Sequence, residues 1–241
     1  MAEILLVRHG QASFGTNDYD ALSELGHLQA AISADYLQRS GTSVDAIYSG
    51  SLRRQQETAR AVLEVYQKAG KAVPAIITDP GFNELENEQQ IEKLAPSLQK
   101  TDPQLRALLK TAHHSKKDFQ KVLKTVFNHW VLEKPEVAGL ESWVSFAARV
   151  RQSLHNIVQQ QGSGKTVLVS TSGGVIATLV AQVIKLPDSG VYSLFEPLLN
   201  ASITRLLYNT AGDISLSSFN DCGYLRAEQI IAGRNDLISY R

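Results

Sequence analysis

A short apolar segment near the N-terminus constrains the fold more than any other feature of the sequence. Residues 4–7 are all apolar and β-favouring, and the polar residues of Arg8-His9-Gly10 end the run. A strand without polar alternation is buried on both faces, which is typical of the central strands of parallel sheets. Ligands of such sheets bind beyond the carboxyl ends of the strands. We therefore expect an α/β protein with functional residues directly after residue 7.

Strand and helix patterns alternate along much of the chain. A helix predicted over 21–40 has Leu25, Leu28, Ile32 and Tyr36 on one face, which we expect to be buried. Further helices are expected to start near Ser51 and at Gly173. The strands expected after the first cover 45–48, 74–78, 166–169, 203–208 and 214–219, with a hydroxyl-rich turn at 170–172 and a hairpin turn at 211–213.

Residues 91–161 interrupt this alternation because they show only helical patterns. The clearest is an apolar stripe over 119–130 behind a Ser115 cap. We interpret 91–140 as a helical insertion within one domain that covers 1–241. The expected fold is a three-layer α/β structure whose central, mainly parallel sheet has helices on both faces.

The composition argues against a polyanionic partner. The 241 residues include 24 Lys plus Arg and 24 Asp plus Glu, so an anion site must depend on a local concentration of positive charge. We expect a small phosphorylated substrate as partner, and no nucleic acid or membrane. Oligomeric state is left open, and a homodimer is one alternative.

Cysteine content and the N-terminus favour a cytoplasmic location. The single cysteine, Cys222, cannot form an internal disulfide, which suits a reducing compartment. The apolar run before Arg8 is too short for a signal peptide, and no apolar stretch approaches the length needed to span a membrane.

Three predicted strand ends carry residues suited to phosphate chemistry. They are Arg8-His9-Gly10, the pair Arg53 and Arg54, and the segment 170–174. Phosphoryl transfer requires a nucleophile in line with the leaving oxygen and positive groups around the other phosphoryl oxygens. An arginine pair of this kind can also simply extend into water. Beside arginines at the end of a buried strand, however, His9 would be held neutral, which is the form that a nucleophilic nitrogen requires.

Several of these segments, in the same order, resemble the histidine phosphatase superfamily, also called the phosphoglycerate mutase-like family. Residues 5–10 are similar to its signature, 22–30 to the helix entry that follows, and 51–59 to its second arginine segment. The resemblance extends to weaker matches at 141–149, 200–204 and 220–225. It implies a phosphohistidine intermediate on His9 and places Arg54, rather than Arg53, at the phosphate.

The proton donor implied by the resemblance is a glutamate. Phe82-Asn83-Glu84-Leu85 is similar to the segment that supplies this acid, which points to Glu84, with Glu86 as the alternative. Either carboxylate could instead be one solvated acid in a charged loop.

Two segments depart from the family pattern. Ser172 stands where members usually carry a second histidine before the Gly-Gly helix entry, so the site would lack one charge-assisted phosphate contact. Residues 11–15 lack the acidic residue and Trp-Asn pair of phosphoglycerate mutases, and the glycine and acidic continuation after the donor is also absent. These departures argue against a mutase.

The sequence therefore predicts a metal-independent phosphomonoesterase without a cofactor. Arg8, Arg54, Ser172 and Gly173 are expected to hold the phosphoryl oxygens, and Gln11 and Ser13 to contact substrate. The second hypothesis is a weak or inactive phosphate-binding module, because Ser172 replaces histidine, and the third is mutase-type phosphoryl transfer. We interpret His113-His114 as a solvated pair rather than a metal site.

Overall fold

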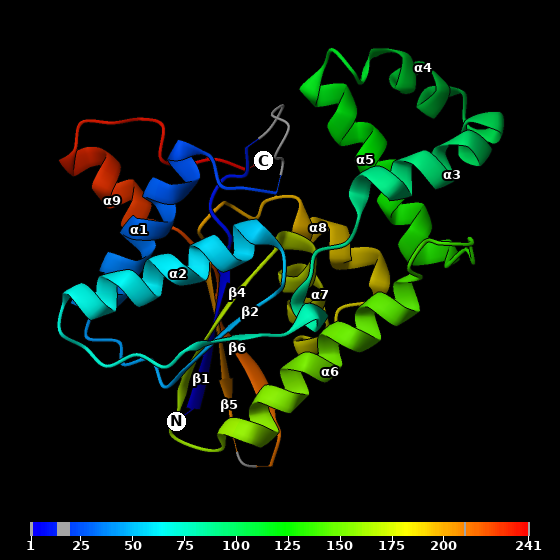
Figure 1. Ribbon diagram of the computed structural model, residues 1–241. Helices are drawn as coiled ribbons and strands as arrows, with labels where there is room; N and C mark the ends of the chain where they lie inside the picture. Colours follow the sequence, from blue (N-terminus) through cyan, green and yellow to red (C-terminus); the bar gives the residue numbers. More distant parts are fainter. Residues whose placement is uncertain (1, 14–19, 210, 241) are drawn as a thin grey trace.

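A computed structural model describes residues 2–13, 20–209 and 211–240, which form one six-stranded sheet with helices on both faces (Figure 1). The strand order is β3-β2-β4-β1-β5-β6. The strands are β1 (Ala2–Arg8), β2 (Ala46–Ser49), β3 (Ile76–Thr78), β4 (Thr166–Thr171), β5 (Ile203–Tyr208) and β6 (Ile214–Asp221). The helices are α1 (Glu24–Arg39), α2 (Arg53–Lys68), α3 (Asn87–Thr101), α4 (Pro103–Thr111), α5 (Lys116–Glu133), α6 (Trp143–Gln161), α7 (Gly173–Val183), α8 (Val191–Phe195) and α9 (Gly223–Ile231), with 3-10 turns η1 (Pro80–Phe82) and η2 (Asp188–Gly190).

The apolar segment that opens the chain forms the inner strand β1. It pairs in parallel with β4 and antiparallel with β5. Successive side chains of a strand point to opposite faces, so Ile4 and Leu6 enter one hydrophobic core while Leu5 and Val7 enter the other. The run is apolar throughout because both faces of β1 are covered by helices, as the sequence predicts.

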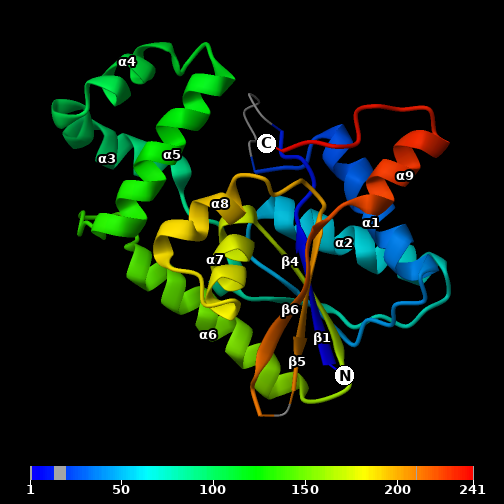
Figure 2. The same ribbon diagram turned by 180° about the vertical axis from the view of Figure 1, so that it is seen from behind.

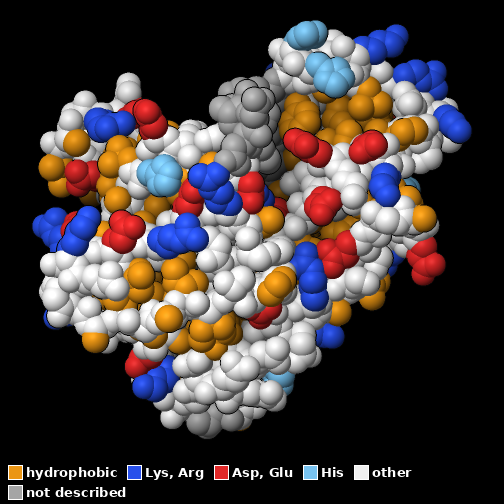
Figure 3. All heavy atoms as spheres, in the orientation of Figure 1, with side chains coloured by type: hydrophobic (Ala, Val, Ile, Leu, Met, Phe, Trp, Pro, Cys, Tyr) orange, Lys and Arg blue, Asp and Glu red, His pale blue; other side chains and the backbone are white. Residues whose placement is uncertain are grey.

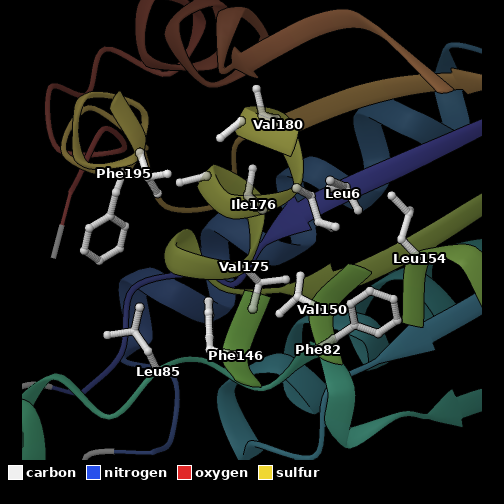
Figure 4. Close-up of a cluster of buried hydrophobic side chains, with 14 of the residues drawn as sticks. Leu6, Phe82, Leu85, Phe146, Val150, Leu154, Val175, Ile176, Val180 and Phe195 are labelled. Atoms are coloured by element: carbon white, nitrogen blue, oxygen red, sulfur yellow. The ribbon is translucent and has the colours of Figure 1, made fainter. Parts of the chain in front are cut away.

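The two faces of the sheet are covered by different helices (Figures 1 and 2). Helices α1 and α2 pack on one face, and α6 and α7 on the other. Figure 4 shows Leu6 of β1 among side chains of α6 and α7, including Phe146, Val150 and Ile176, all fully buried. This arrangement confirms the expected three-layer α/β fold. Strands β3, β2, β4 and β1 are mutually parallel, and the β5-β6 hairpin is antiparallel.

Helices α3, α4 and α5 stand beyond the carboxyl ends of the parallel strands (Figure 1). They begin at Asn87, earlier than the expected boundary at residue 91, and α5 ends at Glu133. The Ser115 side chain accepts a hydrogen bond from the backbone N–H of Asp118, as a cap at this position should. Within the described ranges, no helix is long and apolar enough to cross a membrane.

Two local predictions were wrong. Apart from Leu37, the residues on the buried face of α1 are small or polar, whereas Tyr36 is exposed and stacks on Tyr224. The segment expected to turn at 170–172 continues β4 through Thr171, because Ser170 and Thr171 pair with neighbouring strands. The residues that α1 buries are Gly26, Gln29, Ala30, Ser33, Ala34 and Leu37.

Candidate active site

The ends of three neighbouring parallel strands bring the predicted site residues together. Arg8 of β1 lies in register with Thr171 of β4, and the backbone N–H of His9 donates to the Thr171 carbonyl at 2.9 Å. On the other side of β4, the N–H of Gly50 donates to the Ser170 carbonyl at 3.2 Å. The chain then enters α2, which carries Arg54. The sheet thus places three separate sequence segments at one edge.

His9 is buried and hydrogen-bonded in a way that selects one neutral tautomer. Its Nδ1 lies 2.7 Å from the Gly10 carbonyl, which can only accept, so Nδ1 carries the proton. The other ring nitrogen, Nε2, accepts from Arg54 Nε at 3.2 Å. Burial, reinforced by the charges of Arg54 and Arg8, holds the pKa of His9 well below its ordinary value of 6.5. At neutral pH, Nε2 therefore presents a lone pair, as a nucleophile must.

The lowered pKa of His9 should make stability fall in acid. Below pH 6.5 the unfolded chain protonates this histidine and the folded chain does not, so unfolding becomes more favourable as pH falls. Until the lowered folded pKa is reached, wild type should lose up to about 1.4 kcal/mol per pH unit more than His9→Asn. Above pH 6.5 the two proteins should show the same pH dependence. Urea unfolding of both proteins at pH 7.5, 6.5 and 5.5 measures this difference, and parallel curves throughout would contradict it.

Gly10 lets the strand end approach α1 closely. A Cβ built on Gly10 would lie 2.2 Å from the carbonyl oxygen of Gly26, and one on Gly26 would lie 2.1 Å from the Gln11 carbonyl oxygen. Both contacts are with backbone atoms that cannot move aside, so both positions require glycine. The close approach holds the backbone that follows His9 against the first turn of α1.

Gln11 and Ser13, the two residues expected to contact substrate, follow Gly10 in the chain. Gln11 is half-buried, and its Oε1 accepts from the Ser23 hydroxyl at 3.0 Å, while its backbone N–H donates to Gln29. The N–H of Ser13 donates to the Ala21 carbonyl at 2.8 Å. Phe14 and Gly15, the last two residues of the segment 11–15 that departs from the family pattern, lie outside the described residues.

Arg8 and Gly173 meet at the floor of the site. Arg8 is buried, and its Nη1 donates to the Leu198 carbonyl. A Cβ built on Gly173 would lie 3.5 Å from Arg8 Nε. The first residue of α7 is therefore beside the Arg8 guanidinium, where the helix N-terminus and the arginine present positive charge together.

Of the pair Arg53 and Arg54, only Arg54 faces the site. Arg54 contacts His9, whereas Arg53 Nε pairs with Glu57 at 2.7 Å on the surface of α2. Arg54 Nη1 also forms an ion pair with Asp20 Oδ1 at 2.5 Å, and Asp20 Oδ2 accepts from the Arg53 N–H. Sequence reasoning missed Asp20, which carries no motif and reaches Arg54 only through tertiary structure.

Asp20 places a carboxylate where a substrate phosphate would bind Arg54. We expect Asp20→Asn to bind inorganic phosphate about three- to tenfold more tightly, because the variant removes a like charge from a partly solvated site. Isothermal titration with phosphate measures the change. Asp35→Asn, which affects an exposed pair with Arg39, is the control and should leave affinity unchanged. Weaker binding by Asp20→Asn would show that Asp20 chiefly orients Arg54.

Glu84 reaches the site from the segment after η1. The N–H of Gly174 donates to both carboxylate oxygens, at 3.0 and 3.1 Å. A Cβ on Gly174 would lie 2.3 Å from Glu84 Oε1, so this contact requires glycine. Glu86, the alternative donor, is exposed at the N-cap of α3. The geometry favours Glu84, because its carboxylate is tied to the same helix entry that follows Ser172.

Arg149 of α6 holds the Glu84 segment in place. Its Nη1 donates to the carbonyls of Gly81 and Asn83 at 2.9 and 3.0 Å. The same guanidinium binds Glu141 through two hydrogen bonds at 2.7 and 2.9 Å. The matched segment at 141–149 therefore supports the site indirectly.

Ser172 is fully buried at the point where the chain passes from β4 into α7. The residue before it, Thr171, accepts from the His9 N–H, and the residue after it is Gly173. Its hydroxyl oxygen accepts a hydrogen bond from Gln55 Nε2 at 2.8 Å. The sequence did not single out Gln55.

A cavity of about 720 Å³ extends from Arg54 and Glu84 toward α3 and α5. Four glutamates line it without an ion pair among the described residues, whereas the fifth, Glu141, is paired with Arg149. Figure 3 shows acidic side chains gathered where α3 and α5 rise from the main body. The four cavity glutamates without an ion pair are Glu84, Glu86, Glu88 and Glu92. In the part of the chain that the structure describes, no three His, Cys, Asp or Glu residues are grouped to hold a metal ion.

A sequence model of the histidine phosphatase superfamily (branch 1) matches residues 4–221, which include every segment of this site. The chain belongs to this superfamily. Among curated relatives, it is 22% identical over 230 residues to the mitochondrial serine/threonine-protein phosphatase Pgam5 of Drosophila mojavensis. That alignment covers 94% of this chain and 65% of the relative, so the chain spans just under two thirds of that protein's length.

Solved structures with low sequence identity to this chain share the fold. Bacillus stearothermophilus YhfR superimposes with a TM-score of 0.65 at 19% identity, over 93% of this chain and 99% of that one. A mycobacterial glucosyl-3-phosphoglycerate phosphatase gives a TM-score of 0.60 at 22% identity, over 90% and 98%. At these identities the likeness concerns the fold.

Proposed function

We propose that this protein is a metal-independent phosphomonoesterase that acts through a phosphohistidine on His9. One observation carries the proposal: the ring of the buried His9 is fixed by the Gly10 carbonyl at Nδ1, and its Nε2 accepts a hydrogen bond from Arg54. Membership of the histidine phosphatase superfamily supports the same reaction, and several matched proteins are phosphatases by name. A nucleophile between two arginines suits attack on a phosphate dianion.

The first step transfers the phosphoryl group to the enzyme. On binding, phosphoryl oxygens replace Asp20 and His9 Nε2 as partners of the Arg54 guanidinium, which frees the lone pair. Nε2 then forms a bond to phosphorus as the bond to the ester oxygen breaks. Protonated Glu84 gives its proton to the departing oxygen, and the Gly10 carbonyl stabilises the charge that develops on the ring through Nδ1–H.

The second step returns the enzyme to its starting state. Water attacks the phosphohistidine, Glu84 accepts the water proton, and the N–P bond breaks to release phosphate and neutral His9. Arg8, Arg54, Ser172 and Gly173 hold the phosphoryl oxygens throughout, and Gln11 and Ser13 contact the remainder of the substrate. The positive charge required comes from the arginines and the N-terminus of α7.

Phosphate release from an aryl phosphate in the presence of EDTA tests this proposal. Turnover that is unchanged by EDTA is expected, because no proposed step uses a metal. The second hypothesis, a binding module, predicts phosphate-dependent thermal stabilisation without turnover. The third predicts exchange of phosphate between isomers of phosphoglycerate without net release. The cytoplasmic location and the single-domain organisation stay predictions.

The acidic cavity should select against substrates that carry a negative charge in addition to the phosphate. Glu86, Glu88 and Glu92 are exposed on its wall and have no ion-pair partner among described residues. We expect kcat/KM for 3-phosphoglycerate to be at least about tenfold lower than for an alkyl phosphate whose alkyl group is uncharged, because the carboxylate of 3-phosphoglycerate would face these groups. Replacing all three glutamates with glutamine should reduce the difference in kcat/KM between the two substrates.

The control for this comparison is Glu64→Gln, which changes an exposed acid of α2 that does not line the cavity. This variant should leave the substrate ratio as in wild type. A wild-type preference for 3-phosphoglycerate would contradict the prediction and favour the mutase hypothesis.

A further inference from the structure

Ser172 occupies a helix-capping position but does not cap the helix. Serine at this position normally accepts a hydrogen bond from a backbone N–H of the first helical turn. The Ser172 side chain makes no such bond to α7, although its backbone is extended, as a cap residue requires. Its oxygen instead accepts from Gln55 Nε2. The hydroxyl is therefore held away from its usual local partner.

Gln55 is bound tightly enough to impose this orientation. The side chain is fully buried in the first turn of α2, next to Arg54. Its Nε2 uses both hydrogens, one to Ser172 Oγ at 2.8 Å and one to the Phe82 carbonyl at 3.0 Å. The Phe82 carbonyl also accepts from Thr171, which fixes it in place. The amide nitrogen can donate to Ser172 but cannot accept from it.

This orientation of the Gln55 amide is unfavourable for its side-chain oxygen. Oε1 is buried and has no hydrogen-bond donor among the described residues. A buried amide oxygen without a partner is unfavourable, and such groups are uncommon in native proteins. The orientation that leaves Oε1 unpaired is the one in which Nε2 serves both Phe82 and Ser172.

We propose that Gln55 is a positioning residue that turns the Ser172 hydroxyl hydrogen toward the phosphoryl oxygens. Because Ser172 Oγ already accepts from Gln55, its own hydrogen is free to donate. Ser172 lies in the chain between Thr171, whose carbonyl accepts from the His9 N–H, and Gly173, which lies beside Arg8. Gln55 and Ser172 together thus provide a neutral donor where the superfamily pattern has an imidazole. This inference rests on the proposed phosphate site.

A double-mutant cycle tests the pair. Gln55→Met keeps the side-chain size and removes the amide, and Ser172→Ala removes the hydroxyl. Each single change should lower kcat/KM for an aryl phosphate and the affinity for inorganic phosphate by about tenfold. The double variant should lose no more than the single variants, because Gln55 acts only through Ser172. Ser172→Thr keeps a hydroxyl and should retain most activity.

Gln56→Met is the matched control. Gln56 lies in the same helical turn and bonds the Gly50 carbonyl and Thr78, away from Ser172. Its effect on both measurements should be less than about twofold. Thermal unfolding checks that each variant is folded. If Gln55→Met fails to fold, Gln55→Glu replaces it, since a carboxylate accepts the Ser172 hydrogen and should cause the same loss.

The outcomes separate this inference from the proposed function. Additive losses in the double variant, or wild-type phosphate affinity in both single variants, would overturn the role of Gln55. Absence of turnover in wild type would contradict the proposed enzyme. In that case the phosphate affinities of the variants would still test whether Gln55 acts through Ser172, because a binding module uses the same contacts.

Discussion

Replacing His9 with alanine should lower kcat for an aryl phosphate by at least about 10³-fold, the largest effect of any single change. The variant removes Nε2, and no other described side chain could take over as nucleophile between Arg8 and Arg54. Folding should be little affected near neutral pH, since the alanine also removes a buried titratable group. Phosphate release under saturating substrate measures the loss.

The control for this experiment is His155→Ala. His155 is an exposed histidine of α6 that bonds Gln159, and its replacement should leave kcat within about twofold of wild type. Retained turnover in a folded His9→Ala protein would show that water attacks the phosphate directly. The phosphohistidine mechanism would then be wrong.

Glu84→Gln should have the next largest effect, and the effect should depend on the leaving group. Glutamine can still accept from Gly174 N–H, so the site geometry is preserved. For an alkyl phosphate, kcat should fall by about 10²- to 10⁴-fold, because the departing alkoxide receives no proton. A nitrophenyl phosphate needs no such proton and should give a burst of nitrophenol followed by slow turnover, since Glu84 also activates water in the second step.

Glu86→Gln distinguishes the two candidate donors. Glu86 is exposed at the start of α3, and its replacement should give neither a burst nor a large loss with alkyl phosphates. The reverse result, with normal kinetics for Glu84→Gln and a burst for Glu86→Gln, would assign the donor to Glu86. Stopped-flow absorbance of nitrophenol release measures both variants.

The elements predicted well from sequence are those whose surroundings are uniform. Residues 4–7 are apolar throughout because β1 has a hydrophobic core on each side, so the sequence predicts a central strand. The predicted cap at Ser115 is confirmed because capping depends only on residues three positions apart. Strand ends could be expected to converge because parallel strands place their carboxyl ends at one edge.

The error in the buried face of α1 arose because close packing, rather than hydrophobicity, determines which residues face inward. Helix α1 packs closely against the strand end at Gly10, so its inner face carries Gly26 and Gln29, and Tyr36 is left outside. The buried amide of Gln29 is used to bind the backbone of Gln11 and Leu237. A search for the most apolar helical face cannot find a face chosen for close approach and hydrogen bonding.

Candidate site residues could be proposed from sequence only where a motif carried them. His9, Arg54 and Glu84 each lie in a recognisable segment, whereas Asp20 and Gln55 act through partners distant in sequence. Glutamine beside Arg54 looks like a routine helical residue until the structure shows it fully buried. Tertiary contact, rather than local pattern, defines its role.

Direct detection of a phosphoryl group on His9 tests the central proposal most directly. Glu84→Gln should accumulate the intermediate when mixed with a nitrophenyl phosphate, and alkaline quenching should preserve the acid-labile N–P bond. Mass spectrometry of the proteolysed protein should then find one added phosphoryl group on the peptide containing His9. A burst of nitrophenol without this modification, or with phosphate on another residue, would contradict the account.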